Sequence, residues 1–157
     1  MRVQDVMTDS PRACGVNASA NEAARIMWEQ DCGAVPVLAD DGRVAGIVTD
    51  RDICMAAYFR GVPLSSIRVA EIMSSDVCTV RADDEISTAE RRMRDRQVNR
   101  LPVVEDGGSL VGILSLCDLT HSVKRAGGLR QKAPDGQELL ETVAAIREPR
   151  IQRSMAS

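Results

Sequence analysis

The decapeptide VAGIVTDRDI, from Val44 to Ile53, returns as LVGILSLCDL from Leu110 to Leu119. The two copies stand 66 residues apart, and no insertion or deletion interrupts this spacing. Each copy has a glycine among alternating apolar residues and a hydroxyl residue followed three positions later by aspartate. A period of this size indicates that one supersecondary unit has been used twice.

The same spacing holds on both sides of the decapeptide. The sequence Val-Pro-Val at 35–37 reappears as Leu-Pro-Val at 101–103, and Val6-Met7 reappears as Ile72-Met73. The spacing therefore predicts a first repeat, a linker, a second repeat and a polar tail, which span residues 1–61, 62–66, 67–126 and 127–157.

Each repeat is expected to contain an amphipathic opening segment, a short strand, a helix, two hairpinned strands and a closing helix. Asp41-Gly42 and Gly107-Gly108 are the hairpin turn signals. Gly33 and Asn99 are predicted to end the first helix of each repeat in the left-handed conformation. The predicted fold class is α+β (α/β), with two pseudo-symmetric repeats that each form a small three-stranded sheet with flanking helices and bury each other.

The composition is that of a globular protein, with 44% apolar and 27% charged residues. The apolar runs are too short for a membrane span, and the polar N-terminus lacks a secretory signal. The five cysteines are odd in number and form no C-x-x-C pair, so we expect buried, reduced thiols. These features predict a cytoplasmic protein without a membrane partner.

The charge distribution disfavours nucleic acid binding by the repeats. Residues 1–123 carry 13 basic and 19 acidic side chains, a net charge of −6, whereas residues 124–157 carry a net charge of +3. A cluster of arginines is interleaved with acidic residues and predicts a solvated helix face; its members are Arg91, Arg92, Arg94 and Arg96.

Most catalytic constellations lack their parts. His121 is the only histidine, which excludes histidine-rich metal sites, and we expect it to be exposed near a helix end. Neither lysine belongs to a P-loop, and no G-x-G-x-x-G occurs. We therefore expect neither an enzyme nor a metal site.

The two strand-to-helix turns, Thr49 to Asp52 and Ser115 to Asp118, are the remaining candidates for ligand chemistry. One interpretation is a capping box, which stabilises a helix by about 1 kcal/mol. The other is a nucleotide site: the helix start suits phosphate, Arg51 neutralises charge, and the carboxylate accepts hydrogen bonds from ribose. The residues themselves leave both interpretations open.

Both repeats resemble the cystathionine-β-synthase (CBS) motif. The matching residues are GIVTDRD at 46–52 and GILSLCD at 112–118, each preceded by a valine- or leucine-proline-valine segment and opened by D-V-M-T or E-I-M-S. The resemblance covers about residues 1–124 and implies a tandem pair, or Bateman module, with two clefts between the repeats. Members of the family often bind AMP, ADP, ATP or S-adenosylmethionine there.

The resemblance also implies which residues meet the ligand. Thr49 and Ser115 would meet phosphate or ribose, and Asp52 and Asp118 the ribose hydroxyls. Adenine would lie against apolar segments that contain Cys14, Val16, Val35, Pro36, Val80, Leu101 and Pro102.

The second repeat departs from this pattern. It has Leu116 and Cys117 where the first repeat has Asp50 and Arg51, so that it loses a phosphate partner. Arg100 is a candidate to supply the missing charge, with a solvent-facing role as the alternative. Occupancy of both clefts is therefore left open.

Two functions compete on this basis. The first is a regulatory module that binds an adenosyl ligand and signals to a protein partner. The second is a ligand-free interaction module that acts through its helical faces and an amphipathic tail helix at 135–147, whose packing on its own body or on a partner is open. Trp28, Tyr58 and Phe59 are expected in the core or an interface, and the family resemblance implies a homodimer.

Overall fold

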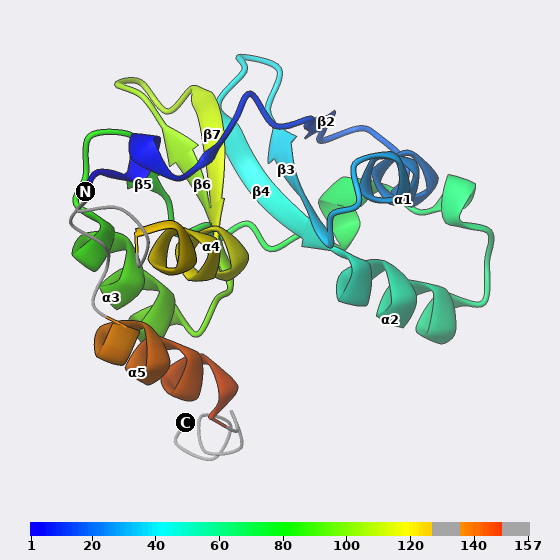
Figure 1. Cartoon of the computed structure of the whole chain (residues 1–157). Coiled ribbons are helices and arrows are strands. Elements are labelled where there is room, and N and C mark those ends of the chain that lie inside the picture. The colour runs from blue at the N-terminus through cyan, green and yellow to red at the C-terminus, as the bar shows by residue number, and fades with distance from the viewer. Residues whose placement is uncertain (127–135, 149–157) are drawn as a thin grey trace, which may run out of the picture.

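The computed structural model describes residues 1–126 and 136–148 (Figure 1). The α-helices are α1 (Ala20–Glu29), α2 (Asp50–Arg60), α3 (Ile86–Arg96), α4 (Leu116–Ala126) and α5 (Gly136–Arg147). The strands are β1 (Thr8–Asp9), β2 (Cys14–Gly15), β3 (Ala34–Leu38), β4 (Val44–Thr49), β5 (Val80–Arg81), β6 (Arg100–Val104) and β7 (Leu110–Ser115). Three short 3-10 helices complete the described elements: η1 (Val3–Asp5), η2 (Leu64–Ser66) and η3 (Val69–Glu71).

The strands form two sheets, as the repeat predicts. The first repeat has three strands in the order β2-β3-β4, with β2 parallel and β4 antiparallel to β3. The second sheet has the order β1-β7-β6-β5 and contains one strand from the N-terminal segment. The mixed α/β fold is confirmed, and the second sheet is one strand larger than expected.

The predicted hairpins are confirmed. Gly42, Gly107 and Gly108 have φ angles of 79°, 92° and 88°, which favour glycine. The prediction of left-handed caps at Gly33 and Asn99 is wrong.

The left-handed residues lie two positions earlier, at Asp31 and Gln97, with φ angles of 48° and 50°. The helices end at Glu29 and Arg96, so the chain has already turned before it reaches Gly33 and Asn99.

The opening segment of each repeat packs on the other repeat. The backbone N–H of Val3 donates to Asp84 O at 3.0 Å, and the N–H of Val69 donates to Ala18 O at 2.8 Å. Val3 belongs to the hydrophobic core of the second repeat, and Ile67 and Val69 belong to that of the first. Each core is therefore completed by residues from the other copy.

A methionine and a glycine meet at each of these crossings. Met73 Sδ lies against Gly46 of β4, and Met7 Sδ lies against Gly112 of β7. Thr8 in β1 pairs with Ile113, and Ser74 forms the equivalent bridge to Ile47. The glycine of the motif is thus needed because a methionine from the other repeat approaches its backbone closely.

The two sheets also meet at their hairpins. Arg43 and Ser109 form an isolated bridge, and the Val44 N–H donates to Gly108 O at 3.2 Å. Strands β4 and β7 accordingly lie side by side in the centre of the molecule (Figure 1).

The tail helix α5 packs on its own chain, against α3 and α4 (Figure 1). Leu139 and Ile146 join the core of the second repeat. Arg94 of α3 donates to Thr142 Oγ1 at 2.9 Å and lies 3.6 Å from Glu138. Asp135, where the predicted tail helix begins, lies outside the described residues.

The cysteines are free, but their burial differs from the expectation. Cys14 is buried and Cys32 and Cys78 are half-buried, whereas Cys54 and Cys117 are exposed on the outward faces of α2 and α4. The prediction of buried thiols is therefore wrong for these two. None of the helices in the described ranges has the length and apolar character of a membrane span.

The substitution Gly46→Ala is expected to lower the free energy of unfolding by about 1 to 3 kcal/mol, because the added Cβ would collide with Met73 and lie 3.1 Å from the backbone oxygen of Ser74. Urea denaturation measures this loss. Gly15→Ala is the matched control, since a Cβ there meets nothing within 4 Å. Equal unfolding midpoints for both variants would refute the assigned role of Gly46.

Candidate functional site

Both strand-to-helix turns form capping boxes. In the first, Asp52 Oδ2 accepts from the backbone N–H of Thr49 at 2.8 Å and from its hydroxyl at 2.7 Å. In the second, Asp118 Oδ2 accepts from Ser115 N–H and hydroxyl at 2.7 and 2.6 Å. The capping interpretation is confirmed.

The cap uses only one oxygen of each carboxylate. Within residues 1–126 and 136–148, Oδ1 of Asp52 and Oδ1 of Asp118 accept no hydrogen bond. A cap and a ligand contact are therefore compatible at the same aspartate.

The backbone amides of the first turn of α2 are already bonded. Asp50 N–H donates to Gly33 O at 3.3 Å, Arg51 N–H donates to Asp50 Oδ1 at 2.7 Å, and Asp52 N–H donates to Thr49 Oγ1 at 3.2 Å. A helix start suits phosphate only where its N–H groups are free, and in the first repeat these three are not. The Asp50 carboxylate occupies the Arg51 N–H group, which a bound phosphate would otherwise use.

Gly33 lies where charges from both repeats converge. A Cβ placed on Gly33 would lie 2.9 Å from Asp50 Oδ2 and 3.2 Å from Arg100 Nη2. Arg100, at the start of β6, therefore reaches across to the first turn of the other repeat. Among the described residues, Asp50 and Arg100 form no ion pair with each other or with another group. The turn presents separated negative and positive charges.

The second turn has the same backbone but no such charges. Leu116 N–H donates to Asn99 O at 2.9 Å, as Asp50 does to Gly33. The Leu116 side chain packs against the core of the second repeat, and Cys117 is exposed. The two turns are therefore alike in fold and different in chemistry.

Most of the apolar residues expected to meet adenine lie in the cores. Val35, Val80 and Leu101 have exposed fractions of 1%, 0% and 0%. Strands β3 and β6 are buried on both faces, and all three side chains belong to the hydrophobic cores of their repeats. Cys14, Pro36 and Pro102 are also buried, and Val16 is half-buried.

Three of the four clustered arginines contact other parts of the chain. Arg96 pairs with Asp76 at 2.6 Å, and Arg92 contacts Thr79 O and Asp84. Arg94 contacts Thr142 and Glu138 of α5. This face of α3 therefore holds other segments of the chain, whereas the pattern predicts a solvated surface.

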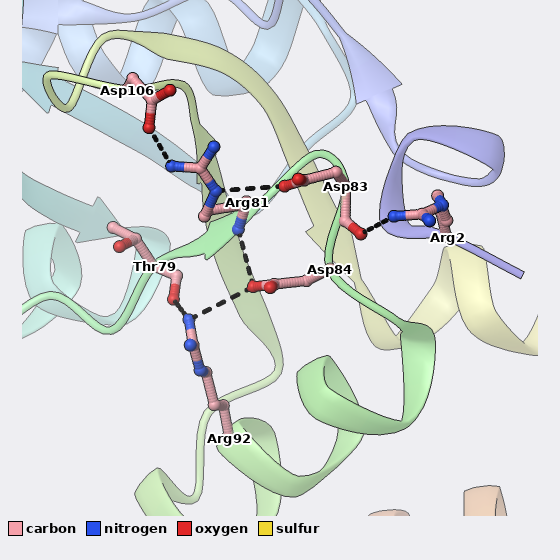
Figure 2. A network of polar contacts seen from close by, with 7 residues as sticks. All are labelled: Arg2, Thr79, Arg81, Asp83, Asp84, Arg92 and Asp106. Atoms are coloured by element: carbon pink, nitrogen blue, oxygen red, sulfur yellow. Dashed lines mark hydrogen bonds and ion pairs between the residues drawn. The ribbon is translucent and has the colours of Figure 1, made fainter.

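Figure 2 shows the neighbouring network around Arg81 in the second repeat. Arg81 contacts Asp106 and Asp83 and lines a hollow of about 240 Å³, and it holds the pKa of Asp106 below its usual value. Arg2 of the opening segment donates to Asp83 O at 2.5 Å. The contact of Arg2 ties the opening segment to the second repeat. Arg81 is already paired with two carboxylates, so its charge is not available to a ligand.

The sequence reasoning missed the roles of Gly33 and Asp50. It assigned Gly33 to a helix cap, and it treated Asp50 as a variable position of the motif. The local sequence gives a signal only for Asp50, because it is a second carboxylate, close to Asp52, at the predicted helix start. Nothing local shows that Arg100 would approach Gly33, since these residues are far apart in sequence.

The family model described as "CBS domain" matches residues 3–58 and 69–125. Among curated proteins, a homoserine O-acetyltransferase of Methanohalophilus mahii is 39% identical over 115 residues, which cover 73% of this chain and 23% of that protein. The chain thus spans about a quarter of the length of that relative.

Two solved structures resemble the whole pair of repeats. One is Hypoxic Response Protein I with two coordinated zinc ions, with 30% identity and a TM-score of 0.70 over 77% of this chain and 98% of that one. The other is the CBS domain pair of protein MJ0100 in complex with 5′-methylthioadenosine and S-adenosylmethionine, with 26% identity and a TM-score of 0.70 over 83% and 98%.

Proposed function

Because the chain belongs to the CBS domain family and carries two copies of its repeat, we propose that it is a regulatory module that binds an adenosyl ligand at the junction of the repeats. The observation that carries this proposal is the convergence of Asp50 and Arg100 at Gly33, beside the capped turn of Thr49 and Asp52. The MJ0100 pair, which binds adenosyl ligands, supports the ligand class.

Among adenosyl ligands, the first turn favours S-adenosylmethionine. Its methionyl end carries an ammonium group and a carboxylate, which complement the Asp50 carboxylate and the Arg100 guanidinium. AMP, ADP or ATP would gain from Arg51 and Arg100, but their phosphates would meet Asp50 and a first turn without free amides. The open oxygen of Asp52 would accept from the ribose hydroxyls.

The second turn fits an uncharged adenosyl compound better. Asp118 retains an open oxygen for ribose, whereas Leu116 and Cys117 supply no charge for phosphate or for an amino acid end. A compound such as 5′-methylthioadenosine meets these conditions, and Ser115 would contribute its hydroxyl oxygen.

Regulation would follow from the crossing of the opening segments. A ligand that contacts both repeats stabilises the relative position of the repeats in which it makes all its contacts. The free energy of this shift equals the difference between the ligand's binding free energies for the two positions. A protein partner would respond to that shift. We expect the ligand to be released unchanged, and a reducing, cytoplasmic location remains a prediction.

Calorimetric titration tests the ligand preference. S-adenosylmethionine should bind more tightly than 5′-methylthioadenosine, which has the same adenosyl group without the charged end. Arg100→Gln should weaken S-adenosylmethionine about tenfold, the loss of a charged hydrogen bond, and leave 5′-methylthioadenosine unchanged. Equal losses for both ligands would refute the zwitterion preference, and no binding of either one or of AMP would refute the proposed function.

A second titration separates the ligand role of Asp52 from its capping role. Asp52→Ala should abolish adenosyl binding and also destabilise α2 by about 1 kcal/mol. Ser19→Ala removes the cap of α1, where Ser19 Oγ accepts from Glu22 N–H at 3.2 Å, and should cost similar stability without loss of binding. If both variants lose binding equally, Asp52 acts only through stability.

We also propose that two chains associate through the helix face of the first repeat. Trp28, Tyr58 and Phe59 have exposed fractions of 88%, 78% and 74%, and Tyr58 and Phe59 stack edge to face at 5.2 Å. These are the only aromatic residues in the sequence. Such a concentration of exposed apolar surface is typical of an interface.

The second repeat supports this assignment by contrast. The position equivalent to Trp28 is Arg94, which contacts α5 through Thr142 and Glu138. The helix face of the second repeat is thus covered by the chain's own tail, and the equivalent face of the first repeat is left for a second copy.

Replacing Trp28 by arginine, the residue of the second repeat, should convert a dimer to a monomer in analytical ultracentrifugation, because a charge would be buried without a partner. Leu140→Arg is the control, since Leu140 is also exposed but lies on α5. A monomeric parent protein, or a Trp28→Arg variant that stays dimeric, would exclude this interface.

A further inference from the structure

Cys117 and His121 form a pair of metal-binding side chains on α4. They are one helical turn apart, both are exposed, and Cys117 Sγ lies 3.8 Å from His121 Nε2. The imidazole therefore presents its Nε2 atom to the thiol across the helix surface.

The separation of the two donor atoms suits one shared ion. Zinc binds thiolate sulfur at about 2.3 Å and imidazole nitrogen at about 2.0 to 2.1 Å, so tetrahedral coordination places the two donors about 3.6 Å apart. We propose that Cys117 and His121 chelate a thiophilic divalent cation of the zinc class.

The site would be open rather than fully enclosed by protein. No group of three or more histidine, cysteine or acidic side chains with metal-binding geometry occurs in the ranges 1–126 and 136–148. The chain thus supplies two donors, and water or an external donor completes the coordination. The sequence excludes a histidine-rich centre, and a two-donor chelate needs only the one histidine present.

The other cysteines do not reproduce this arrangement. Cys54 is exposed on α2, but the residue one turn later is Tyr58. Cys14 is buried, and burial together with Glu22 raises the pKa of its thiol to about 11, which keeps it protonated. Cys32 Sγ donates to Ala34 O at 3.4 Å.

The pair also has no counterpart in the first repeat. The equivalent positions are Arg51 and Met55, which do not chelate a divalent cation together. A metal ion at Cys117 would therefore place positive charge at the turn where the first repeat has a guanidinium. The chelate rests on the geometry of α4 alone and does not require the proposed adenosyl function.

The reduced chain of 157 residues is titrated with Co²⁺ as a spectroscopic probe for zinc. The parent should develop the intense near-ultraviolet absorption of a cobalt–thiolate bond and lose it on addition of Zn²⁺. Cys117→Ser and His121→Asn should each abolish this absorption. Cys54→Ser is the matched control and should behave as the parent does.

A second readout locates the ion without cobalt. Zn²⁺ should protect Cys117 from alkylation by iodoacetamide, measured by mass spectrometry of peptides, and leave the alkylation rate of Cys54 unchanged. His121→Asn should remove this protection while circular dichroism shows an intact fold. The proposal is overturned if the parent gives no cobalt–thiolate absorption, if His121→Asn keeps it at the parent's affinity, or if Cys54→Ser loses it.

Discussion

The structure depends on the exchange of two short segments between its halves. Each opening segment inserts a valine into the core of the other repeat and places a methionine against the motif glycine there. Neither half could bury its sheet without this contribution, because a three-stranded sheet with helices on one face leaves the other face open. The two repeats therefore complete each other's cores, and Arg100 of the second repeat reaches the strand-to-helix turn of the first.

The two repeats have the same backbone fold, but their side chains differ at equivalent positions. The first repeat has charges at its turn and exposed aromatic residues on its helices. The second has an uncharged turn with a cysteine, and its helix face is covered by α5. Duplication thus supplied two equal frames, and substitution at equivalent positions such as Trp28 and Arg94 made them unequal. The proposed site for a charged ligand and the proposed association surface both lie in the first repeat, and the tail helix α5 packs on the second.

The capped turns show how one carboxylate stabilises a helix and still keeps an oxygen that a ligand could use. Asp52 gives one oxygen to Thr49 and keeps the other, so the same carboxylate closes a helix and remains an acceptor. Motif spacing alone does not distinguish these roles, since both require a hydroxyl and a carboxylate three residues apart at a helix start. The hydrogen bonds distinguish them: Oδ2 of Asp52 caps the helix, and Oδ1 is open within the part of the chain that the structure describes. The backbone amide of Arg51 is occupied by the Asp50 carboxylate.

The sequence by itself determined the duplication, the hairpin glycines, the hydroxyl-x-x-aspartate turns and the CBS family, because these depend on residues close together in the chain or repeated at a constant spacing. Only the tertiary structure decided that the opening segments cross over, that Arg100 and Asp50 both approach Gly33, and that Trp28, Tyr58 and Phe59 lie outside the core. The physical reason is that such contacts join distant residues, and an apolar stripe on a helix reads the same whether a core, a tail helix or a second chain covers it.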